Sequence, residues 1–311
     1  MRQPGADLSN SEGKLIEHQP LIGKTIGITG ATAGIGLAAA RVLAAKGATI
    51  LGMGRSAERA AQAAADIRLT VPGAQVHFFT ADLSALRQVR RLAEEIGEYV
   101  TTRHDGKLDV LVNNAGTITS RYTDTEDGYE TVFTVNHLAP FLLTRELLPL
   151  LQAAPAARIL TVSSRSHRNM RILWGNVMLR RFYNPLLAYK QSKLANVLFT
   201  TEFNRRLADT TRIRAYAIDP GLVNTEIGSK NNHGIVRWAW DLRRRQGADP
   251  SVPARTIAMV ASRPKLDPPD GIYWRDCRSI APSRYALRAD EAAKLWALSE
   301  QLCAPEDRFS G

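Results

Sequence analysis

Short runs of apolar residues alternate along the chain with longer segments that repeat apolar residues at the helical period. The short runs have the length of buried strands, and the longer segments have the length of helices. Strands are therefore expected over residues 24–29, 48–52, 75–80, 108–112, 158–162, 213–218 and 271–274. Helices are expected over residues 35–46, 56–69, 85–100, 129–151, 187–208, 253–261 and 289–302.

Repeated strand–helix units of this kind predict a parallel sheet that is covered by helices on both faces. With right-handed crossovers, such units give an α/β fold of the Rossmann type, which is a doubly wound parallel sheet. No linker rich in Pro, Gly or Ser divides the chain, so residues 21–303 are expected to form a single domain. Residues 1–20 are expected to form a flexible N-terminal arm, and residues 304–311 a tail.

The composition is ordinary for a soluble globular protein, with 44% hydrophobic and 23% charged residues in a chain of 311. Two cysteines, Cys277 and Cys303, give no disulfide framework and fit a reducing cytosol. The most apolar stretch, residues 35–53, is interrupted by Arg41 and Lys46, so no transmembrane span is expected. We therefore expect a cytoplasmic protein.

The chain is strongly basic, with a formal net charge of +11 and a sequence pI near 9.9. Such a charge suits binding to nucleic acid, to an anionic membrane surface or to an acidic ligand. An arginine-rich surface that only keeps the protein soluble is an equally simple interpretation. The sequence has no zinc-finger spacing and no basic helix joined to a zipper, so neither nucleic-acid binding nor a metal site is expected.

A glycine-rich turn joins the first predicted strand to the first predicted helix. Gly30 permits a tight turn, Gly34 lets a phosphate approach the backbone, and Gly36 lets the helix pack close to the sheet. The helix N–H groups and dipole then face a pyrophosphate. Glycines also occur in ordinary turns, but this strand–turn–helix context is the one that a dinucleotide site requires. The cofactor-binding residues expected in this turn are Gly30, Thr32, Ala33, Gly34, Ile35 and Gly36.

Tyr189 and Lys193 are four residues apart in a segment of good helix formers, so they share one face of the predicted helix. The pKa of a free tyrosine is about 10, which is too high for efficient acid–base chemistry at neutral pH. A positive charge about 5 Å away, at an effective dielectric constant of about 20, favours the phenolate by roughly 3 kcal/mol. That is about two pKa units. The spacing alone also arises by chance in many helices.

Together with this pair, the glycine turn resembles the corresponding motifs of the short-chain dehydrogenase/reductase family. Matching motifs stand in the family's order: Asn113-Asn114-Ala115-Gly116, Asn136 within Phe133-Thr-Val-Asn-His137, Ser163-Ser164 and Pro220-Gly221. The resemblance runs from about residue 20 to residue 303. It implies an oxidoreductase that transfers a hydride between a nicotinamide and a carbonyl or alcohol carbon.

Two further segments are similar to the retinol-dehydrogenase-like branch of this family. One is Tyr189-x-x-Ser-Lys-Leu-Ala-Asn-Val-Leu-Phe199, which contains the tyrosine and lysine. The other is Gly271-Ile-Tyr-Trp-x-Asp-Cys277, followed by Leu295-Trp296-x-x-Ser299. The similarity to this branch implies a lipophilic small molecule as the carbonyl or alcohol substrate.

The family resemblance implies a catalytic tetrad. Tyr189 would exchange a proton with the substrate oxygen, and Ser164 would donate a hydrogen bond to the same atom. Lys193 would bind the nicotinamide ribose and lower the pKa of Tyr189, and Asn136 would hold a water that connects Lys193 to solvent. Simpler roles are a helix cap for Asn136 and turn positions for Ser163 and Ser164. The family's pattern assigns the catalytic role to the second serine of such a pair.

Cofactor choice is expected to depend on Arg55, which follows the second predicted strand. An acidic residue there would bind the ribose hydroxyls and favour NAD. The guanidinium of Arg55 can instead pair with a 2′-phosphate, so NADP(H) is expected to be preferred, with NAD(H) as the alternative. A solvated arginine at the start of a helix is the simpler interpretation. The resemblance adds further cofactor-binding residues: Asp82, Leu83, Asn114, Ala115, Gly116, Tyr189, Lys193, Pro220, Gly221, Val223 and Thr225.

Residues 226–247 are expected to form a substrate lid, because the family has a mobile segment after Pro220-Gly221. Its tryptophans and arginines suggest an amphipathic element that covers a lipophilic substrate, touches a membrane surface, or simply packs on the protein. Relatives are commonly homo-oligomers. The alternative to an enzyme is a non-catalytic dinucleotide sensor, but such proteins typically lose the tyrosine or the lysine that this chain retains.

Overall fold

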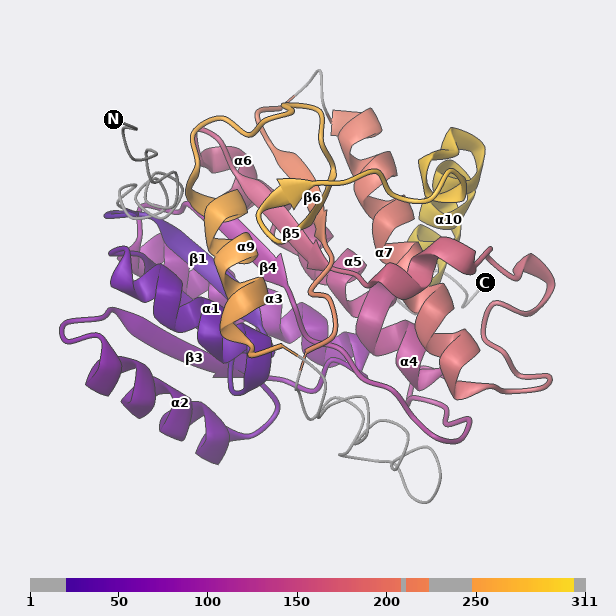
Figure 1. The fold of residues 1–311 in the computed structure, drawn as a ribbon. Helices are drawn as coiled ribbons and strands as arrows, with labels where there is room; N and C mark the ends of the chain where they lie inside the picture. Colours follow the sequence, from indigo (N-terminus) through magenta and orange to yellow (C-terminus); the bar gives the residue numbers. More distant parts are fainter. Residues whose placement is uncertain (1–20, 208–210, 224–247, 305–311) are drawn as a thin grey trace, which may run out of the picture.

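The structure is a computed structural model that describes residues 21–207, 211–223 and 248–304. In this part of the chain, an eight-stranded sheet has the order β3-β2-β1-β4-β5-β6-β7-β8 (Figure 1). The strands are β1 (Thr25–Thr29), β2 (Thr49–Gly54), β3 (Val76–Thr80), β4 (Val110–Asn113), β5 (Arg158–Val162), β6 (Arg214–Ile218), β7 (Tyr273–Arg275) and β8 (Arg278–Ser279). Strands β1 to β7 run parallel, and β8 pairs antiparallel with β7.

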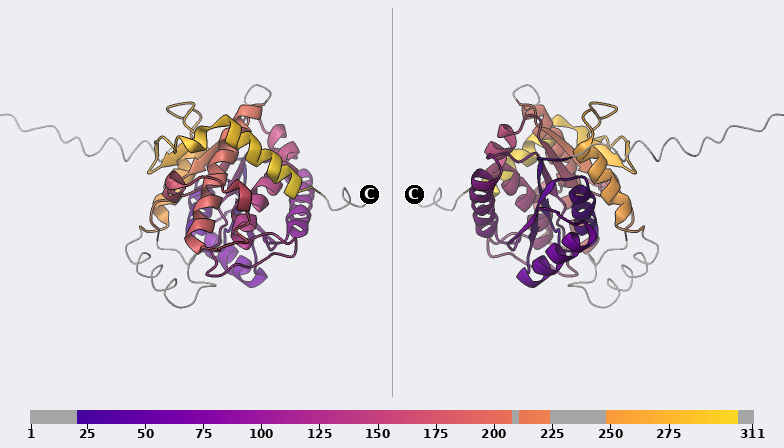
Figure 2. Two further views of the ribbon diagram at one scale, coloured as in Figure 1. Left: turned by 90° about the vertical axis from the view of Figure 1, so that its right-hand side faces the viewer. Right: turned by 90° about the vertical axis from the view of Figure 1, so that its left-hand side faces the viewer.

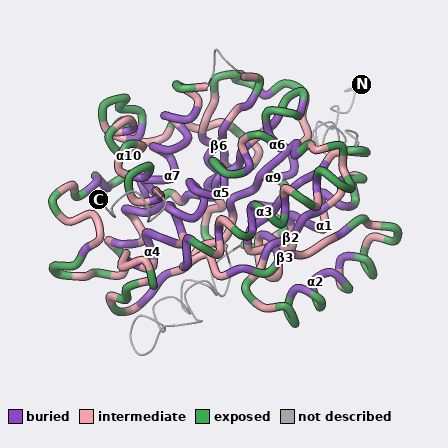
Figure 3. The backbone as a smooth tube through the Cα atoms, turned by 180° about the vertical axis from the view of Figure 1, so that it is seen from behind, coloured by how far each residue is buried: buried purple, intermediate pink, exposed green. Residues whose placement is uncertain are grey.

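Helices cover both faces of the sheet and form a separate apolar core with each face. The longer helices are α1 (Gly34–Ala45), α2 (Ala57–Thr70), α3 (Leu86–Arg103), α5 (Ala139–Glu146), α7 (Pro185–Leu207), α9 (Ser251–Ser262) and α10 (Ala289–Leu302). Helices α1, α2 and α9 pack on one face, whereas α3, α5, α7 and α10 contribute to the core on the other. Figure 3 shows the buried residues along the strands and the inner sides of these helices.

The chain order of the strands reverses between β1 and β4, which are neighbours in the sheet. From β1, one half of the sheet continues through β2 and β3, and the other continues through β4 to β7. Loops that leave the carboxyl ends of β1 and β4 therefore diverge to opposite faces and leave a crevice between them. Doubly wound sheets bind ligands at this point, so the topology locates the candidate site.

Helix α10 lies on the outer side of α7, as Figure 2 shows for the C-terminal part of the chain. The Trp296 ring stacks on Phe199 with a centroid distance of 5.8 Å and meets Phe141 edge-on at 5.0 Å. The buried His137 ring also bonds to Ser299 of α10, with 2.9 Å between Nε2 and Oγ. These aromatic and polar contacts hold α10 against α7, α5 and the segment around His137.

The predicted single-domain, doubly wound parallel sheet is confirmed, and all seven predicted strands are present. The helical region predicted over residues 129–151 is present, but it is divided into several elements. This region contains α4 (Thr131–Phe133), a π-helix η1 (Thr134–Leu138), α5 and α6 (Leu148–Ala153). The short strand β8 was not predicted. The expected arm, lid and C-terminal tail lie outside the described residues, except for residue 304.

Candidate active site

The glycine turn between β1 and α1 leaves no room for larger residues at its two ends. Gly30 has φ +67° and Gly34 has φ +54°, both in the left-handed region. A Cβ atom at position 36 would lie 2.3 Å from the Gly30 carbonyl oxygen and 2.6 Å from Asn114 Nδ2. Ala33 caps α1 without a side-chain hydrogen bond, so the first N–H groups of the helix are free to face an anion.

Thr29 and Asn114 join the ends of β1 and β4 on either side of the crevice. The Thr29 hydroxyl accepts hydrogen bonds from the backbone N–H groups of Asn114 and Ala115, both at 2.9 Å. Asn114 Nδ2 donates to the Thr29 carbonyl at 2.8 Å. This pairing places residues 114–116 beside the glycine turn. The predicted cofactor residues on these two strands are therefore adjacent in the structure.

Strands β2 and β3 bring the other predicted nucleotide-binding residues to the same edge of the sheet. Arg55 is exposed directly after β2. The Thr32 methyl group lies beside residue 54, where a Cβ atom would be 2.5 Å from it. Asp82 follows β3, and its Oδ1 accepts from both the N–H and the hydroxyl of Ser84, at 2.9 and 2.8 Å. The Asp82 carboxylate therefore orders its own loop, and the partly buried Leu83 packs against the core.

The loop after β6 contains Pro220 and Gly221, and Gly221 adopts φ +73°. Val223 pairs with Ala248 in an isolated parallel bridge, so the described segments on either side of residues 224–247 meet at this point. Thr225 and the predicted lid over residues 226–247 lie outside the described residues. The structure therefore places three of the four cofactor residues predicted after β6.

The two serines that follow β5 have different surroundings. Ser163 is fully buried, and its hydroxyl donates to the Lys193 carbonyl at 2.7 Å, which ties the end of β5 to α7. Ser164 is only partly buried and hydrogen-bonds through its side chain to Tyr189. Of the two, only Ser164 is therefore placed to act on the same substrate atom as the tyrosine.

Lys193 is buried one helical turn after Tyr189. Its Nζ donates to the Val162 carbonyl at 2.9 Å and lies 5.6 Å from the centre of the Tyr189 ring. Burial lowers the pKa of Lys193 to about 8. Burial also raises the pKa of Tyr189 to about 12, against the opposite effect of its hydrogen bond with Ser164.

The expected depression of the Tyr189 pKa by Lys193 is therefore not observed. The prediction considered only the attraction between an ammonium and a phenolate. In the structure, burial is the largest influence on both groups, and it disfavours the charged form of each.

Asn136 lies in the π-helix η1 and connects the loop after β4 to α7. Its Oδ1 accepts from the Thr117 N–H at 2.7 Å, and its Nδ2 donates to the Thr117 carbonyl and to Ser192 Oγ, both at 3.0 Å. The Ser192 hydroxyl in turn donates to the Tyr189 carbonyl at 2.9 Å. Pro140 has no N–H, so it cannot bond to the residue 136 carbonyl as an α-helix would require, which favours the local π-helix.

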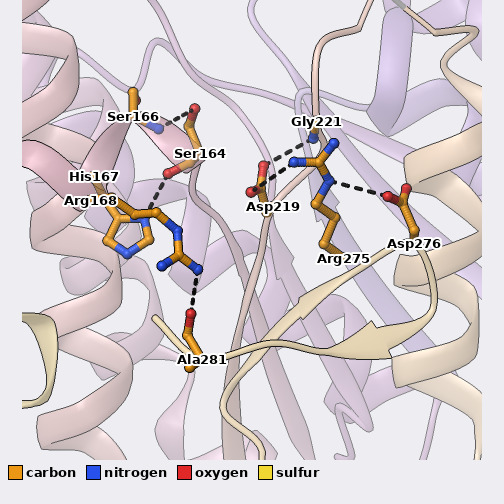
Figure 4. A network of polar contacts seen from close by, with 9 residues as sticks. All are labelled: Ser164, Ser166, His167, Arg168, Asp219, Gly221, Arg275, Asp276 and Ala281. Carbon is orange, nitrogen blue, oxygen red and sulfur yellow. Dashed lines mark hydrogen bonds and ion pairs between the residues drawn. The ribbon is translucent and has the colours of Figure 1, made fainter. Parts of the chain in front are cut away.

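Sequence reasoning missed the polar residues that surround Ser164 and Gly221, which Figure 4 shows from close by. The His167 ring donates from Nδ1 to the Ser164 carbonyl at 2.8 Å. Asp219 accepts from the Gly221 N–H at 3.0 Å and forms an ion pair with Arg275 at 3.9 Å. The sequence did contain an indication of Asp219, because this acidic residue directly precedes the Pro220-Gly221 motif.

The assembled arrangement suits proton exchange at a substrate oxygen beside a bound dinucleotide. A tyrosine hydroxyl and a serine hydroxyl converge, a buried ammonium lies next to them, and the glycine turn is at the same edge of the sheet. Among the described residues, no group of His, Cys, Asp or Glu could hold a metal ion. None of the helices described in the structure is long and apolar enough to cross a membrane.

Comparison with known proteins identifies the family. A family model described as short chain dehydrogenase matches residues 24–235. The chain belongs to the short-chain dehydrogenase family. It is 35% identical to mouse retinol dehydrogenase 14 over 296 residues, covering 89% of this chain and 85% of the relative. It is 36% identical to human retinol dehydrogenase 11 over 289 residues, covering 93% and 88%.

A similar solved structure has the same fold. The crystal structure of an uncharacterized protein from Mycobacterium paratuberculosis is similar with a TM-score of 0.68 and 35% identity, covering 93% of this chain and 96% of that one. The present chain is therefore a retinol-dehydrogenase-like member of the short-chain dehydrogenase family. It is a nicotinamide-dependent oxidoreductase that acts on CH–OH or carbonyl groups.

Gly36→Ala should damage the glycine turn, because the new Cβ meets the backbone oxygen of Gly30. We expect a loss of stability of about 2–3 kcal/mol and a fall in nicotinamide-cofactor affinity of about tenfold or more. Gly97→Ala is the matched control, since nothing lies within 4 Å of its Cβ position in α3. Thermal unfolding and fluorescence titration with NADPH measure both effects. Equal behaviour of the two variants would contradict the packing argument.

The buried Lys193 should make stability depend on pH. Its pKa is lowered from 10.5 to about 8, so between these values the unfolded chain binds more protons than the folded protein. The contribution of Lys193 to stability therefore becomes more favourable as pH rises through this window. Lys193→Met should lack this change.

Denaturant unfolding at pH 7.5 and pH 10 tests the effect. From pH 7.5 to pH 10, the unfolding free energy of the parent protein should increase by about 2 kcal/mol relative to that of Lys193→Met. Lys107→Met removes an exposed lysine and serves as the control. A difference that stays constant with pH would show that Lys193 does not titrate in this window.

Proposed function

We propose that this protein is an NADP(H)-dependent carbonyl reductase or alcohol dehydrogenase of lipophilic small molecules, with Asn136, Ser164, Tyr189 and Lys193 as its catalytic tetrad. The observation that carries this proposal is the hydrogen bond between Ser164 and Tyr189 beside the buried ammonium of Lys193. When bound, the nicotinamide cofactor supplies the hydride. The residues of the chain orient the reactants and move the proton.

Tyr189 gives its proton to the substrate oxygen in reduction and takes it back in oxidation. Its raised pKa keeps the phenol protonated at neutral pH, which is the form that carbonyl reduction requires. The Ser164 hydroxyl donates a hydrogen bond to the same oxygen, where negative charge develops in the transition state. In the structure it already hydrogen-bonds to Tyr189, so both groups are oriented toward one point.

Lys193 and Asn136 support this proton transfer. Lys193 is anchored to the Val162 carbonyl, and we assign its ammonium to the nicotinamide ribose hydroxyls. Asn136 is held by Thr117 and Ser192. Its place in the π-helix, four residues before Pro140, leaves its carbonyl without the usual helical donor. This carbonyl is therefore suited to hold a water next to Lys193.

The cofactor residues form a continuous edge from β3 to β6. The helix N-terminus at Gly34 would hold the pyrophosphate, and Asn114 would bind the nicotinamide half of the cofactor. Arg55 is exposed after β2, where its guanidinium can pair with the 2′-phosphate of NADP(H). NAD(H) would lack this contact and bind more weakly.

Exposed apolar side chains that are close in sequence to Gly221 and Tyr189 support a lipophilic substrate. Leu222, which follows Gly221, is 57% exposed, and Leu186, in the turn of α7 before Tyr189, is 44% exposed. The relatives named as retinol dehydrogenases are consistent with such a substrate.

Both cysteines are free thiols, which supports a reducing compartment such as the cytoplasm.

Tyr189→Phe should reduce turnover by about 100-fold or more while it leaves the fold and the cofactor affinity nearly unchanged. The ring remains, but the transferable proton is lost. Tyr183→Phe is the matched control, because Tyr183 bonds to Thr119 and Glu130 rather than to Ser164. Steady-state kinetics with a panel of lipophilic aldehydes, ketones and alcohols measures the effect. Retention of a third of the turnover would disprove the assigned role.

Arg55→Ala should remove most of the preference for NADPH over NADH. One charge-assisted bond to the phosphate contributes about 1.5–3 kcal/mol, which is roughly a 10- to 100-fold rise in the NADPH Michaelis constant. Arg59→Ala, an exposed arginine one turn later in α2, is the control. If the parent enzyme prefers NADH, or if the cofactor ratio is the same in Arg55→Ala, Arg55 does not select the cofactor.

A further inference from the structure

His167 joins the turn that contains the proposed catalytic serine to the segment that follows β8. Its Nδ1 lies 2.8 Å from the Ser164 carbonyl oxygen, and its Nε2 lies 3.0 Å from the backbone nitrogen of Ser283. The residue is fully buried, and its ring packs on Tyr273 with a centroid distance of 4.9 Å. One side chain therefore contacts two segments that are far apart in the sequence.

The two hydrogen-bond partners of the ring require a single tautomer. A carbonyl oxygen can only accept a hydrogen bond, so Nδ1 must carry a proton, whereas a backbone N–H can only donate, so Nε2 must keep its lone pair. The neutral imidazole with its proton on Nδ1 satisfies both partners. A charged ring would instead point a second N–H at the Ser283 N–H. Burial lowers the pKa of His167, which also favours the neutral ring.

The hydrogen bonds of this turn hold Ser164 at its backbone and at its side chain. The Ser164 carbonyl accepts from the His167 ring and also, at 3.1 Å, from the His167 backbone N–H. The Ser164 hydroxyl oxygen accepts from the Ser166 N–H at 3.3 Å, which leaves the hydroxyl proton available for donation. Figure 4 shows the His167 ring directed at this carbonyl and the Ser166 N–H directed at the hydroxyl. The ring therefore helps to fix the backbone from which the Ser164 side chain reaches Tyr189.

We infer that His167 is a positioning residue for the proposed reaction: as a neutral ring with its proton on Nδ1, it holds the Ser164 carbonyl and thereby directs the Ser164 hydroxyl to the substrate oxygen. The inference rests on the proposed role of Ser164 as a hydrogen-bond donor. His167 acts through Ser164 and need not touch the substrate. Because the Ser283 N–H selects the tautomer, the segment after β8 contributes to the site without supplying a catalytic group.

Two substitutions separate the two hydrogen bonds of the ring. His167→Gln keeps an oxygen near the Nε2 position that can accept from the Ser283 N–H, but it has no donor near the Nδ1 position. His167→Asn places an amide donor near the Nδ1 position, where it can reach the Ser164 carbonyl, but it has no acceptor for Ser283. If the bond to Ser164 matters for the reaction, His167→Asn should therefore be the more active variant.

Arg168 provides the matched control, because it anchors the same turn at a different point. It lies beside His167 in η2 (Arg165–Asn169), and its guanidinium donates to the Ala281 carbonyl, which precedes Ser283 by two residues. Arg168→Met therefore weakens the attachment of η2 to the segment after β8 but leaves the bond between the His167 ring and Ser164 in place. A purely structural role of His167 would make the two residues equivalent in their effect on the reaction.

Single-turnover reduction of the fastest lipophilic aldehyde of the panel by NADPH measures the chemical step. His167→Gln should slow this step by about 10- to 100-fold with little change in the dissociation constant of NADPH, and His167→Asn should recover most of the rate. Arg168→Met should lower the thermal midpoint but keep the parent rate. In a Ser164→Ala background, His167→Gln should cause no further loss, because the hydroxyl that it positions is gone. An equal loss in both backgrounds, or in Arg168→Met, overturns the inference.

The tautomer is tested in the full-length protein without cofactor or substrate. With ¹⁵N-labelled histidine, the nitrogen shifts distinguish a protonated from an unprotonated ring nitrogen, and contact with the Tyr273 ring identifies His167 among the six histidines. At neutral pH, Nδ1 should be protonated and Nε2 unprotonated. The opposite tautomer or a charged ring overturns the inference, and this measurement decides it even if no variant at residue 167 folds. Full activity of Ser164→Ala overturns the proposed role of the serine instead.

Discussion

The attachment of α7 to the end of β5 is the interaction on which the candidate site depends. Lys193 Nζ donates to the Val162 carbonyl at 2.9 Å, and Ser163 Oγ donates to the Lys193 carbonyl at 2.7 Å. These reciprocal bonds fix the helix against the strand at one register. Because Ser164 is the next residue on one element and Tyr189 is one turn earlier on the other, the same register brings their hydroxyls together.

Taken alone, this attachment lowers the stability of the fold, because it removes the Lys193 ammonium from water. The surrounding fold supplies the compensating stability. Helix α10 covers the outer side of α7 through the aromatic contacts of Trp296 with Phe199 and Phe141. On the other side, Asn136 and Ser192 connect α7 to the loop after β4. The polar site is therefore held between two packed regions rather than on a free loop.

The sequence predicted the sheet and its topology because buried parallel strands and amphipathic helices have different hydrophobic periods. The spacing of the glycines also located the turn between β1 and α1. In the structure, a Cβ atom at residue 36 of this turn would have no space. The sequence did not predict the π-helix at Asn136, which depends on Pro140 within an otherwise helical pattern. Nor did it predict the Tyr189 pKa, because desolvation depends on how α7 packs and not on the spacing to Lys193.

The charges around Tyr189 favour one direction of proton transfer. Burial and the Asp219 carboxylate both disfavour the phenolate, and the hydrogen bond from Ser164 opposes them. The same burial lowers the pKa of Lys193 to about 8, so part of its positive charge is lost in mildly alkaline solution. A protonated phenol next to a partly charged ammonium is a proton donor. In the role proposed for Tyr189, a protonated phenol suits the protonation of a developing alkoxide, and the deprotonation of an alcohol is expected to be favoured by higher pH.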